Sequence, residues 1–355
     1  MNRYLPRSKA TFLAIAVLTV ILGVLATYYL PVRFFYDAQT IINDYDNEKG
    51  FVGSYPVTMS FYEYTGLGSL PFPLVAFIQL IMLLWVIYKI GIPEHFASLN
   101  LRNILVYTMI LMLAFYISMP SKEFLTFLFI GLIVGIFQKK RFSVTTTISM
   151  VFLLLIAFGL WFRLYYAILP VLTLMIFYAS RIKIKQQVLA GLVTGFVVMI
   201  FISLSYGFLK GEFLSESTRE ALNAERLGKL ATNSVINSPV KPDTWYGESF
   251  SILYGFISVN IPVNGLRHIL KPQILLFIAW QLLFTLYLFW LFKNALKSKR
   301  KNSLEIWIFS LVFSYFILQG VFEPDLGSAV KHKIGILPLL YYILYYDDFR
   351  KNIPV

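Results

Sequence analysis

The chain contains no cysteine and only three histidines among its 355 residues. The absence of cysteine excludes disulfides, thiol catalysis and cysteine-ligated metals, and it leaves His95, His268 and His332 as candidate metal or proton-transfer groups. Charged residues are also scarce, at 14% of the chain, whereas 58% of the residues are hydrophobic and the mean hydropathy is +0.70. This imbalance exceeds what a water-soluble core requires, so the composition indicates a protein embedded in a lipid bilayer.

Long apolar runs account for most of the chain. A membrane-spanning helix needs about 20 apolar residues, because every backbone polar group in lipid must be satisfied within its own helix. On this criterion we predict about ten transmembrane helices, two of which, 124–138 and 334–346, are shorter than usual. The predicted spans are 10–30, 71–89, 104–119, 124–138, 143–162, 165–180, 187–207, 273–292, 304–322 and 334–346.

The distribution of lysine and arginine predicts the orientation of these spans. With the amino terminus in the cytoplasm, the inner segments collect most of the 31 basic residues, including the runs at 139–141 and 293–301. That distribution satisfies the positive-inside rule and places both termini in the cytoplasm. The inner runs face anionic lipid, so the net charge of +13 gives no reason to invoke nucleic acid.

We therefore predict an all-α, polytopic membrane protein that forms one integral domain over residues 1–355, with outer loops at 31–70 and 208–272. No internal repeat of the kind found in transporters divides the chain. The apolar segment 249–263 is a further candidate for a crossing, but a crossing there would put the basic run 293–301 outside. We expect this segment to lie in the outer interface.

Ionisable side chains gather at five places on the predicted outer edge of the membrane. Charge near a bilayer is costly and is usually kept for function, although a helix cap or a snorkelling side chain explains any one of these places equally well. Two of the turns, the one with Lys122 and Glu123 and the one with Arg163, are very short. A turn that only reversed the chain would not need these charged residues. The five places hold Arg33 and Asp37; Lys122 and Glu123; Arg163 and Tyr165; Arg267 and His268; and Glu323, Asp325, Ser328, Lys331 and His332.

The last outer turn is the richest in polar groups. Ser328, Lys331 and His332 have the i, i+3, i+4 spacing that places side chains on one face of a helix. Such a face would hold an anion through Lys331 and the positive end of the helix, while His332 or a preceding carboxylate takes a proton. An interface imidazole bonded to the backbone remains the alternative for His332.

This combination of side chains suits a lipid-linked sugar diphosphate at the membrane edge. Arginine and lysine bind diphosphate, and a carboxylate or histidine beside it can deprotonate a sugar hydroxyl. Asp44 and Asp46 form an Asp-x-Asp pattern like the metal site of sugar-nucleotide transferases. They lie on the outer side, where sugar nucleotides are not available, and two carboxylates are few ligands for a hard cation. We predict no metal and no cofactor.

Four short motifs carry a family resemblance. They are Phe35-Tyr36-Asp37, Pro120-Ser121-Lys122-Glu123, Phe162-Arg163-Leu164-Tyr165-Tyr166, and the stretch from Glu323 to His332 ahead of Leu337-Pro338-Leu339. Together they resemble the bacterial polysaccharide polymerases of the Wzy and EpsG type. In the last motif, Lys331 stands where the family pattern has an arginine before the histidine.

The resemblance implies a multi-span, GT-C-like glycosyltransferase of the bacterial cytoplasmic (inner) membrane with an outward-facing active site. Its substrate would be an undecaprenyl-diphosphate-linked oligosaccharide, polymerised into O-antigen, capsule or exopolysaccharide, and its partners a flippase and a chain-length regulator. The resemblance implies Arg163, Lys331 and Lys122 as diphosphate binders, and His332, Glu323 or Asp37 as the general base. To these we add the outer-edge residues Arg33, Arg267 and Tyr165 as substrate-binding candidates.

A flippase or other transporter of lipid-linked sugars is the main alternative. The charges of a transporter should line a path through the bilayer, whereas the predicted spans are almost free of ionisable residues and the outer turns are rich in them. This contrast favours a one-sided site. A membrane O-acyltransferase is a third hypothesis, but it needs a histidine at membrane depth, and His332 at the start of a helix fits that role poorly.

Overall fold

The computed structural model describes residues 6–44, 47–139, 141–226, 234–262, 265–266, 270, 272–298 and 303–350. Within these ranges every regular element is a helix, and one isolated bridge pairs Val235 with Asp325. The predicted all-α class is confirmed. The chain divides into two compact units, Met1–Leu164 with Lys331–Val355, and Tyr165–Val330. The expectation of one integral domain stays a prediction.

The first unit contains five long helices and a set of short ones. The long helices are α1 (Arg7–Tyr29), α4 (Phe72–Ile90), α5 (Leu101–Tyr116), α6 (Lys122–Phe137) and α7 (Val144–Trp161). Between α1 and α4 lie η1 (Val32–Phe34), α2 (Tyr36–Asn43), α3 (Ser54–Tyr64) and η2 (Leu67–Ser69). The end of the chain adds α15 (Leu337–Leu344) and α16 (Tyr346–Arg350), and α14 (Leu326–Gly335) has residues in both units.

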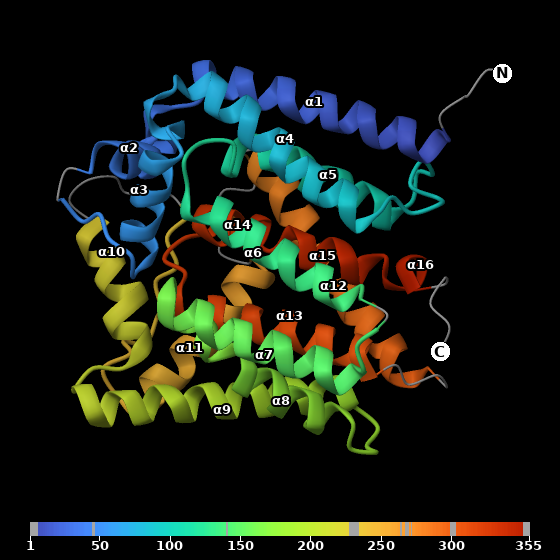
Figure 1. Ribbon diagram of the computed structural model, residues 1–355. Coiled ribbons are helices and arrows are strands. Elements are labelled where there is room, and N and C mark those ends of the chain that lie inside the picture. The colour runs from blue at the N-terminus through green and yellow to red at the C-terminus, as the bar shows by residue number, and fades with distance from the viewer. Residues whose placement is uncertain are drawn as a thin grey trace. The chain divides into compact units, whose positions relative to one another are not determined.

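The long helices of the first unit pack closely in pairs. Helix α1 lies against α4 and α5 (Figure 1), and α6 packs on α4 and α15. Glycine makes two of these approaches possible. A Cβ added at Gly23 would lie 2.2 Å from Leu80 Cδ1, and one at Gly131 would lie 2.7 Å from Val86 Cγ1. Small residues at such crossings let helices in a membrane approach each other closely.

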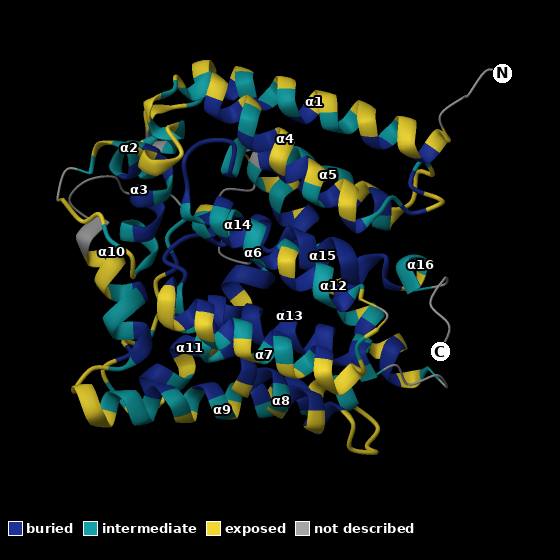
Figure 2. Ribbon diagram, viewed as in Figure 1, coloured by how far each residue is buried: buried dark blue, intermediate teal, exposed yellow. Residues whose placement is uncertain are grey.

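The second unit is built around α13 (Ser303–Phe322), which packs against α8 (Leu169–Ser180), α9 (Gln187–Lys210), α11 (Trp245–Asn260) and α12 (Pro272–Lys297). Helix α13 is buried along almost its whole length, whereas α9 has many exposed side chains (Figure 2). Shorter elements complete the unit: η3 (Leu164–Ala167), apart from its first residue, η4 (Glu216–Glu220) and α10 (Ala221–Arg226).

Six of the described helices are long and apolar enough to cross a membrane, namely α1, α4, α7, α9, residues Ile274–Lys297 of α12, and α13. Their length and composition support the prediction of a membrane protein. Every predicted span up to 304–322 coincides with a helix, and most bounds agree within a few residues. The count of ten spans and the cytoplasmic location of the termini stay predictions.

The predicted tenth span, 334–346, is not one continuous helix. Helix α14 ends at Gly335, and α15 begins at Leu337 with Pro338 in its first turn. Proline fits the first turn of a helix, where its missing N–H is not needed. All eight residues of α15 are buried, so its apolar side chains pack against protein. The segment 31–70, predicted as an outer loop, contains the helices α2 and α3.

The segment 249–263 also lies mainly in a helix. Helix α11 covers Trp245–Asn260 and packs against α13, with one face buried. Gly255 and Gly320 make this approach possible, because a Cβ at Gly255 would lie 1.9 Å from the Gly320 carbonyl oxygen. The predicted position of this segment in the outer interface stays a prediction.

Candidate functional site

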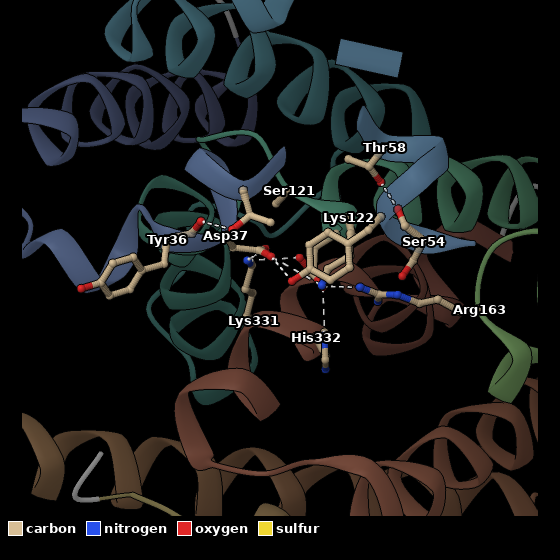
Figure 3. Close-up of polar contacts among 12 residues, drawn as sticks. Tyr36, Asp37, Ser54, Thr58, Ser121, Lys122, Arg163, Lys331 and His332 are labelled. Atoms are coloured by element: carbon tan, nitrogen blue, oxygen red, sulfur yellow. Dashed lines mark hydrogen bonds and ion pairs between the residues drawn. The ribbon is translucent and has the colours of Figure 1, made fainter. Parts of the chain in front are cut away.

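Polar side chains of the first unit converge at one end of its helices (Figure 3). Two carboxylates, two lysines, an arginine and a histidine make up the group, which we call the charged cluster. Helix α2 supplies one carboxylate, the start of α6 supplies the other together with a lysine, and α14 supplies the histidine and the second lysine. The arginine follows α7. The members are Asp37, Lys122, Glu123, Arg163, Lys331 and His332.

The turn before α6 fixes the position of Lys122 and Glu123. The backbone N–H of Ser121 donates to the hydroxyl of Tyr62 over 3.3 Å, and Gln79 Nε2 donates to the same hydroxyl over 2.8 Å. Tyr62 is only 1% exposed and belongs to the core between α2 and α3. The start of α6 is therefore held against α3 and α4 by a buried phenol.

The end of α7 fixes the position of Arg163. The carbonyl of Trp161 accepts a hydrogen bond from the Gly53 N–H at 2.9 Å, and the Trp161 indole donates to the Phe51 carbonyl at 2.7 Å. These bonds attach the segment before α3 to the last turn of α7. Arg163 follows directly and is 8% exposed.

Glu123 is the most deeply buried member of the cluster, at 1% exposure. Its Oε1 accepts from Arg163 Nη2 at 2.6 Å and lies 3.0 Å from His332 Nε2. Its Oε2 lies 3.3 Å from Lys331 Nζ. Three donors on one carboxylate favour its ionised form and orient the side chains that donate to it.

Asp37 lies between the two lysines. Its Oδ2 is 2.5 Å from Lys331 Nζ, and its Oδ1 is 3.5 Å from Lys122 Nζ and accepts the Tyr55 hydroxyl at 2.7 Å. Burial raises the pKa of the Asp37 carboxyl, but the two ammonium groups outweigh it and hold this pKa below its ordinary range. Burial and the Asp37 charge raise the pKa of Tyr55, so its phenol is a neutral donor.

Lys331 connects the two carboxylates. Burial lowers the pKa of its ammonium group, but Asp37 and Glu123 outweigh burial and raise this pKa above its ordinary value. Lys122 lies with its Nζ 3.4 Å from the centroid of the Tyr55 ring, which adds a cation–π contact.

The cluster carries more positive than negative charge. Three cations, Lys122, Arg163 and Lys331, face two carboxylates, which leaves a net charge of +1 with His332 neutral. An excess of positive charge at the edge of apolar helices favours an anionic ligand.

The members of the cluster also lie at different depths. The Glu123 and Arg163 side chains are 1% and 7% exposed and form its floor. The other four side chains are partly exposed, and we call them the rim. The rim side chains are Lys122 at 15%, Lys331 and His332 at 22%, and Asp37 at 23%.

Most of the site residues predicted from the sequence therefore meet in space, but four of the predicted residues are not placed with them. Arg33 lies in η1, but its side chain is outside the described residues, as is Arg267 altogether. Glu323 and Tyr165 belong to the second unit. There Glu323 Oε1 accepts from Gln319 Nε2 at 3.1 Å, and Tyr165 stacks on Phe322 with ring centroids 5.4 Å apart.

The start of the last outer helix, predicted as part of an anion site, is capped by a side chain, and the anion site itself stays a prediction. Helix α14 begins at Leu326, and Asp325 Oδ1 accepts the Ser328 backbone N–H at 2.9 Å. Asp325 is thus the cap that satisfies an N–H at the start of the helix. Ser328 contributes its backbone to this cap, whereas Lys331 extends to the carboxylates of the cluster.

Two members of the site had no assigned role in the sequence prediction. Glu123 is part of a short charged turn and of one resemblance motif but received no role there, although a carboxylate beside a lysine at the start of an apolar helix is itself a signal of a buried ion pair. Tyr55 gave no signal, because nothing in the sequence brings it to Asp37, 18 positions away.

The Asp-x-Asp pattern is only partly described. Asp44 Oδ1 accepts the Glu48 backbone N–H at 2.7 Å, and its Oδ2 lies 4.0 Å from Lys49 Nζ. Asp46 lies outside the described residues. Within the described part of the chain, no group of three or more histidine and carboxylate side chains is arranged to hold a metal ion. The prediction that no metal takes part stays a prediction.

No protein-family model, curated protein or solved structure matches the chain. Its function must be inferred from the cluster. Two chemical capabilities follow from the geometry. The rim lysines can hold an anion, and His332 can move a proton. Because Nε2 of His332 bonds to the Glu123 carboxylate, Nδ1 is the basic nitrogen of the neutral imidazole.

Proposed function

We propose that this protein is a membrane glycosyltransferase that joins undecaprenyl-diphosphate-linked oligosaccharide repeat units into O-antigen, capsule or exopolysaccharide. The reaction would take place on the outer face of the bacterial cytoplasmic membrane, beside a flippase and a chain-length regulator. The observation that carries the proposal is the charged cluster. It combines a surplus of positive charge with a histidine oriented by a buried carboxylate, at the ends of apolar helices.

The rim lysines fit the diphosphate of a lipid-linked sugar. A polyprenyl diphosphate presents its phosphates at the edge of the bilayer, where Lys122 and Lys331 would form charge-assisted hydrogen bonds to phosphate oxygens. Arg163 lies deeper and bonds to Glu123. It would therefore contribute positive charge beneath the phosphates and position Glu123.

Among the three predicted bases, the geometry favours His332. In the free protein Asp37 is held by two ammonium groups and a phenol, and its low pKa makes it a weak base before the substrate binds. Glu323 Oε1 already accepts a hydrogen bond from Gln319 Nε2 at 3.1 Å. His332 is partly exposed and has its Nε2 on Glu123, so its Nδ1 would accept the proton.

The proposed step is a nucleophilic displacement at the anomeric carbon of the donor sugar. The acceptor hydroxyl attacks that carbon and transfers its proton to His332 Nδ1. A new C–O bond forms, and the bond between the anomeric carbon and the diphosphate oxygen breaks. The lipid diphosphate leaves with the electron pair, and the positive charges of the cluster stabilise it.

Deletion of the gene tests this proposal against transport of the same substrate. We expect the deletion strain to lose long polymer while single repeat units persist on the lipid carrier or on the core, and a complemented strain to recover the polymer. The measurement is gel analysis of surface and lipid-linked glycans. If the single units themselves no longer reach the outer face, the protein moves them, and a flippase or transporter function replaces the polymerase function.

A further inference from the structure

The two carboxylates of the charged cluster come from different parts of the first unit. Glu123 is almost fully buried at the start of α6, whereas Asp37 is 23% exposed and belongs to α2. Helix α2 packs on α3, in the segment between α1 and α4. Glu123 orients Arg163 and His332, and Asp37 holds the two rim lysines.

The contacts of Asp37 are those that a phosphate group would make. One carboxylate oxygen is 2.5 Å from Lys331 Nζ, and the other is 3.5 Å from Lys122 Nζ. Phosphate oxygens form the same charge-assisted bonds to ammonium groups. A phosphate that binds both lysines must therefore compete with Asp37 for their N–H donors.

On this basis, and resting on the function proposed above, we propose that Asp37 is an intramolecular competitor of the lipid-linked diphosphate. The substrate binds by exchange, in which phosphate oxygens replace the Asp37 carboxylate on Lys122 and Lys331. Tyr55 stabilises Asp37 in its position on the lysines, because the Tyr55 hydroxyl donates a hydrogen bond to the Asp37 carboxylate.

The charge balance of the cluster favours such an exchange. Each phosphate of a sugar–diphosphate–lipid is a diester with one negative charge, so the diphosphate carries two. With Asp37 in place the cluster has a net charge of +1, and the bound diphosphate would leave an excess of negative charge. Without Asp37, the three cations and Glu123 sum to +2, which neutralises the diphosphate.

The position of Asp37 on α2 allows it to leave the lysines without unfolding the helix. Ala38 and Ile41 hold α2 in place through their buried side chains, whereas the neighbouring Tyr36 points away from the cluster (Figure 3). Asp37 lies in the first turn of α2, where the positive end of the helix stabilises a free carboxylate. In the proposed exchange, a change of side-chain rotamer moves the Asp37 carboxylate off the lysines while α2 stays in place.

The test is the binding of undecaprenyl diphosphate to the purified full-length protein in detergent. We expect Asp37→Asn to bind this probe at least about tenfold more tightly than the wild type, because the competing charge is gone. Glu63→Gln is the matched control: Glu63 lies in the same segment and pairs with Lys49 at 3.1 Å on the surface. Its affinity should equal that of the wild type.

Tyr55→Phe provides a second variant in case Asp37→Asn does not fold. It removes only the hydroxyl that supports Asp37, so we expect tighter binding by a smaller factor, about twofold to fivefold. Unchanged or weaker binding by the folded variants overturns the competition and leaves the proposed function intact. No binding by the wild type or by any variant overturns the proposed function itself.

Discussion

At the scale of single residues, the cluster is costly and its members depend on one another. Removing an ion from water costs several kcal/mol unless a partner and hydrogen bonds compensate. Glu123 obtains that compensation from Arg163, His332 and Lys331 together. Well-packed apolar residues would give a protein in lipid comparable stability. The presence of these charges is therefore better explained by binding and proton transfer than by stability.

Replacing Glu123 should destabilise the first unit. Glu123→Gln removes the carboxylate that neutralises the buried Arg163 side chain, and breaking such a buried pair typically costs about 3 to 5 kcal/mol. Glu63→Gln breaks only a surface pair, worth at most about 1 kcal/mol. Thermal unfolding of both variants in detergent measures the difference. Equal unfolding temperatures for the two variants would show that Glu123 does not stabilise the charged cluster.

The pH dependence of stability follows from Asp37 and Lys331. The pKa of Asp37 is lower in the folded protein than in the unfolded chain, where it is about 3.9. The contribution of Asp37 to the free energy of unfolding is therefore complete above about pH 3.9 and is lost as the pH falls through the lower pKa of the folded state. The pKa of Lys331 is higher in the folded protein than in the unfolded chain, where it is about 10.4. The contribution of Lys331 to the free energy of unfolding is therefore complete below about pH 10.4 and is lost as the pH rises through the higher pKa of the folded state.

Between these limits the ion pair should stabilise the protein by a constant amount. We expect the difference in unfolding temperature between the wild type and Lys331→Met to stay constant from about pH 5 to about pH 9. Thermal unfolding in a series of buffers measures it. A difference that disappears near neutral pH would mean that one partner titrates there and that the pair has been assigned wrongly.

The residues of the site were predictable to the extent that charged side chains next to a predicted span indicate a site at the membrane edge. Asp37, Lys122, Arg163, Lys331 and His332 were all found in this way. The pairing among them was not predictable, because it depends on how distant helix ends meet. The role of Glu123 in orienting His332 and the support that Tyr55 gives to Asp37 both needed the fold.

At the scale of elements, hydropathy predicted the long helices well and their surroundings poorly. An apolar run shows that a helix is buried, but not whether lipid or protein covers it. The run at 334–346 was therefore predicted as one continuous span, whereas α15 is separated from α14 at Ile336 and is buried against protein. A tenth crossing there stays a prediction. The segment 31–70 was predicted as a loop because its helices are short and partly polar, and packing around Tyr62 stabilises them.

The attachment of that segment to α7 can be tested directly. Trp161→Phe keeps an aromatic ring but removes the indole bond to the Phe51 carbonyl, worth about 1 kcal/mol. Local opening should then increase roughly fivefold, and trypsin should cut faster after Lys49, whose side chain is 42% exposed. Gel analysis of limited digests measures the rate.

A second tryptophan provides the control for this experiment. Trp85 lies on an exposed face of α4, at 58% exposure. Trp85→Phe should leave the cleavage rate after Lys49 unchanged. If both variants are cut at the wild-type rate, the indole bond does not secure the segment.

At the scale of the whole molecule, the orientation in the membrane decides what the cluster can bind. The absence of cysteine makes this measurable, since each single-cysteine variant carries one thiol. Tyr64 is 74% exposed in the segment predicted to be outside, and Leu99 is 86% exposed in the turn predicted to be inside. A membrane-impermeant maleimide should label Tyr64→Cys on intact spheroplasts, and Leu99→Cys only after lysis. The opposite pattern would place the cluster in the cytoplasm.

In the proposed reaction, the charged cluster polymerises lipid-linked repeat units with His332 as the base. The most direct measurement is reconstitution of the purified protein in liposomes with undecaprenyl-diphosphate-linked repeat units, with the products separated on a gel. We expect the wild type and His95→Ala, whose histidine lies on an exposed turn, to give a ladder of polymer. His332→Ala should be slower by about a hundredfold or more. A wild-type protein that gives no ladder, or a His332→Ala variant that gives it at the wild-type rate, would contradict the account.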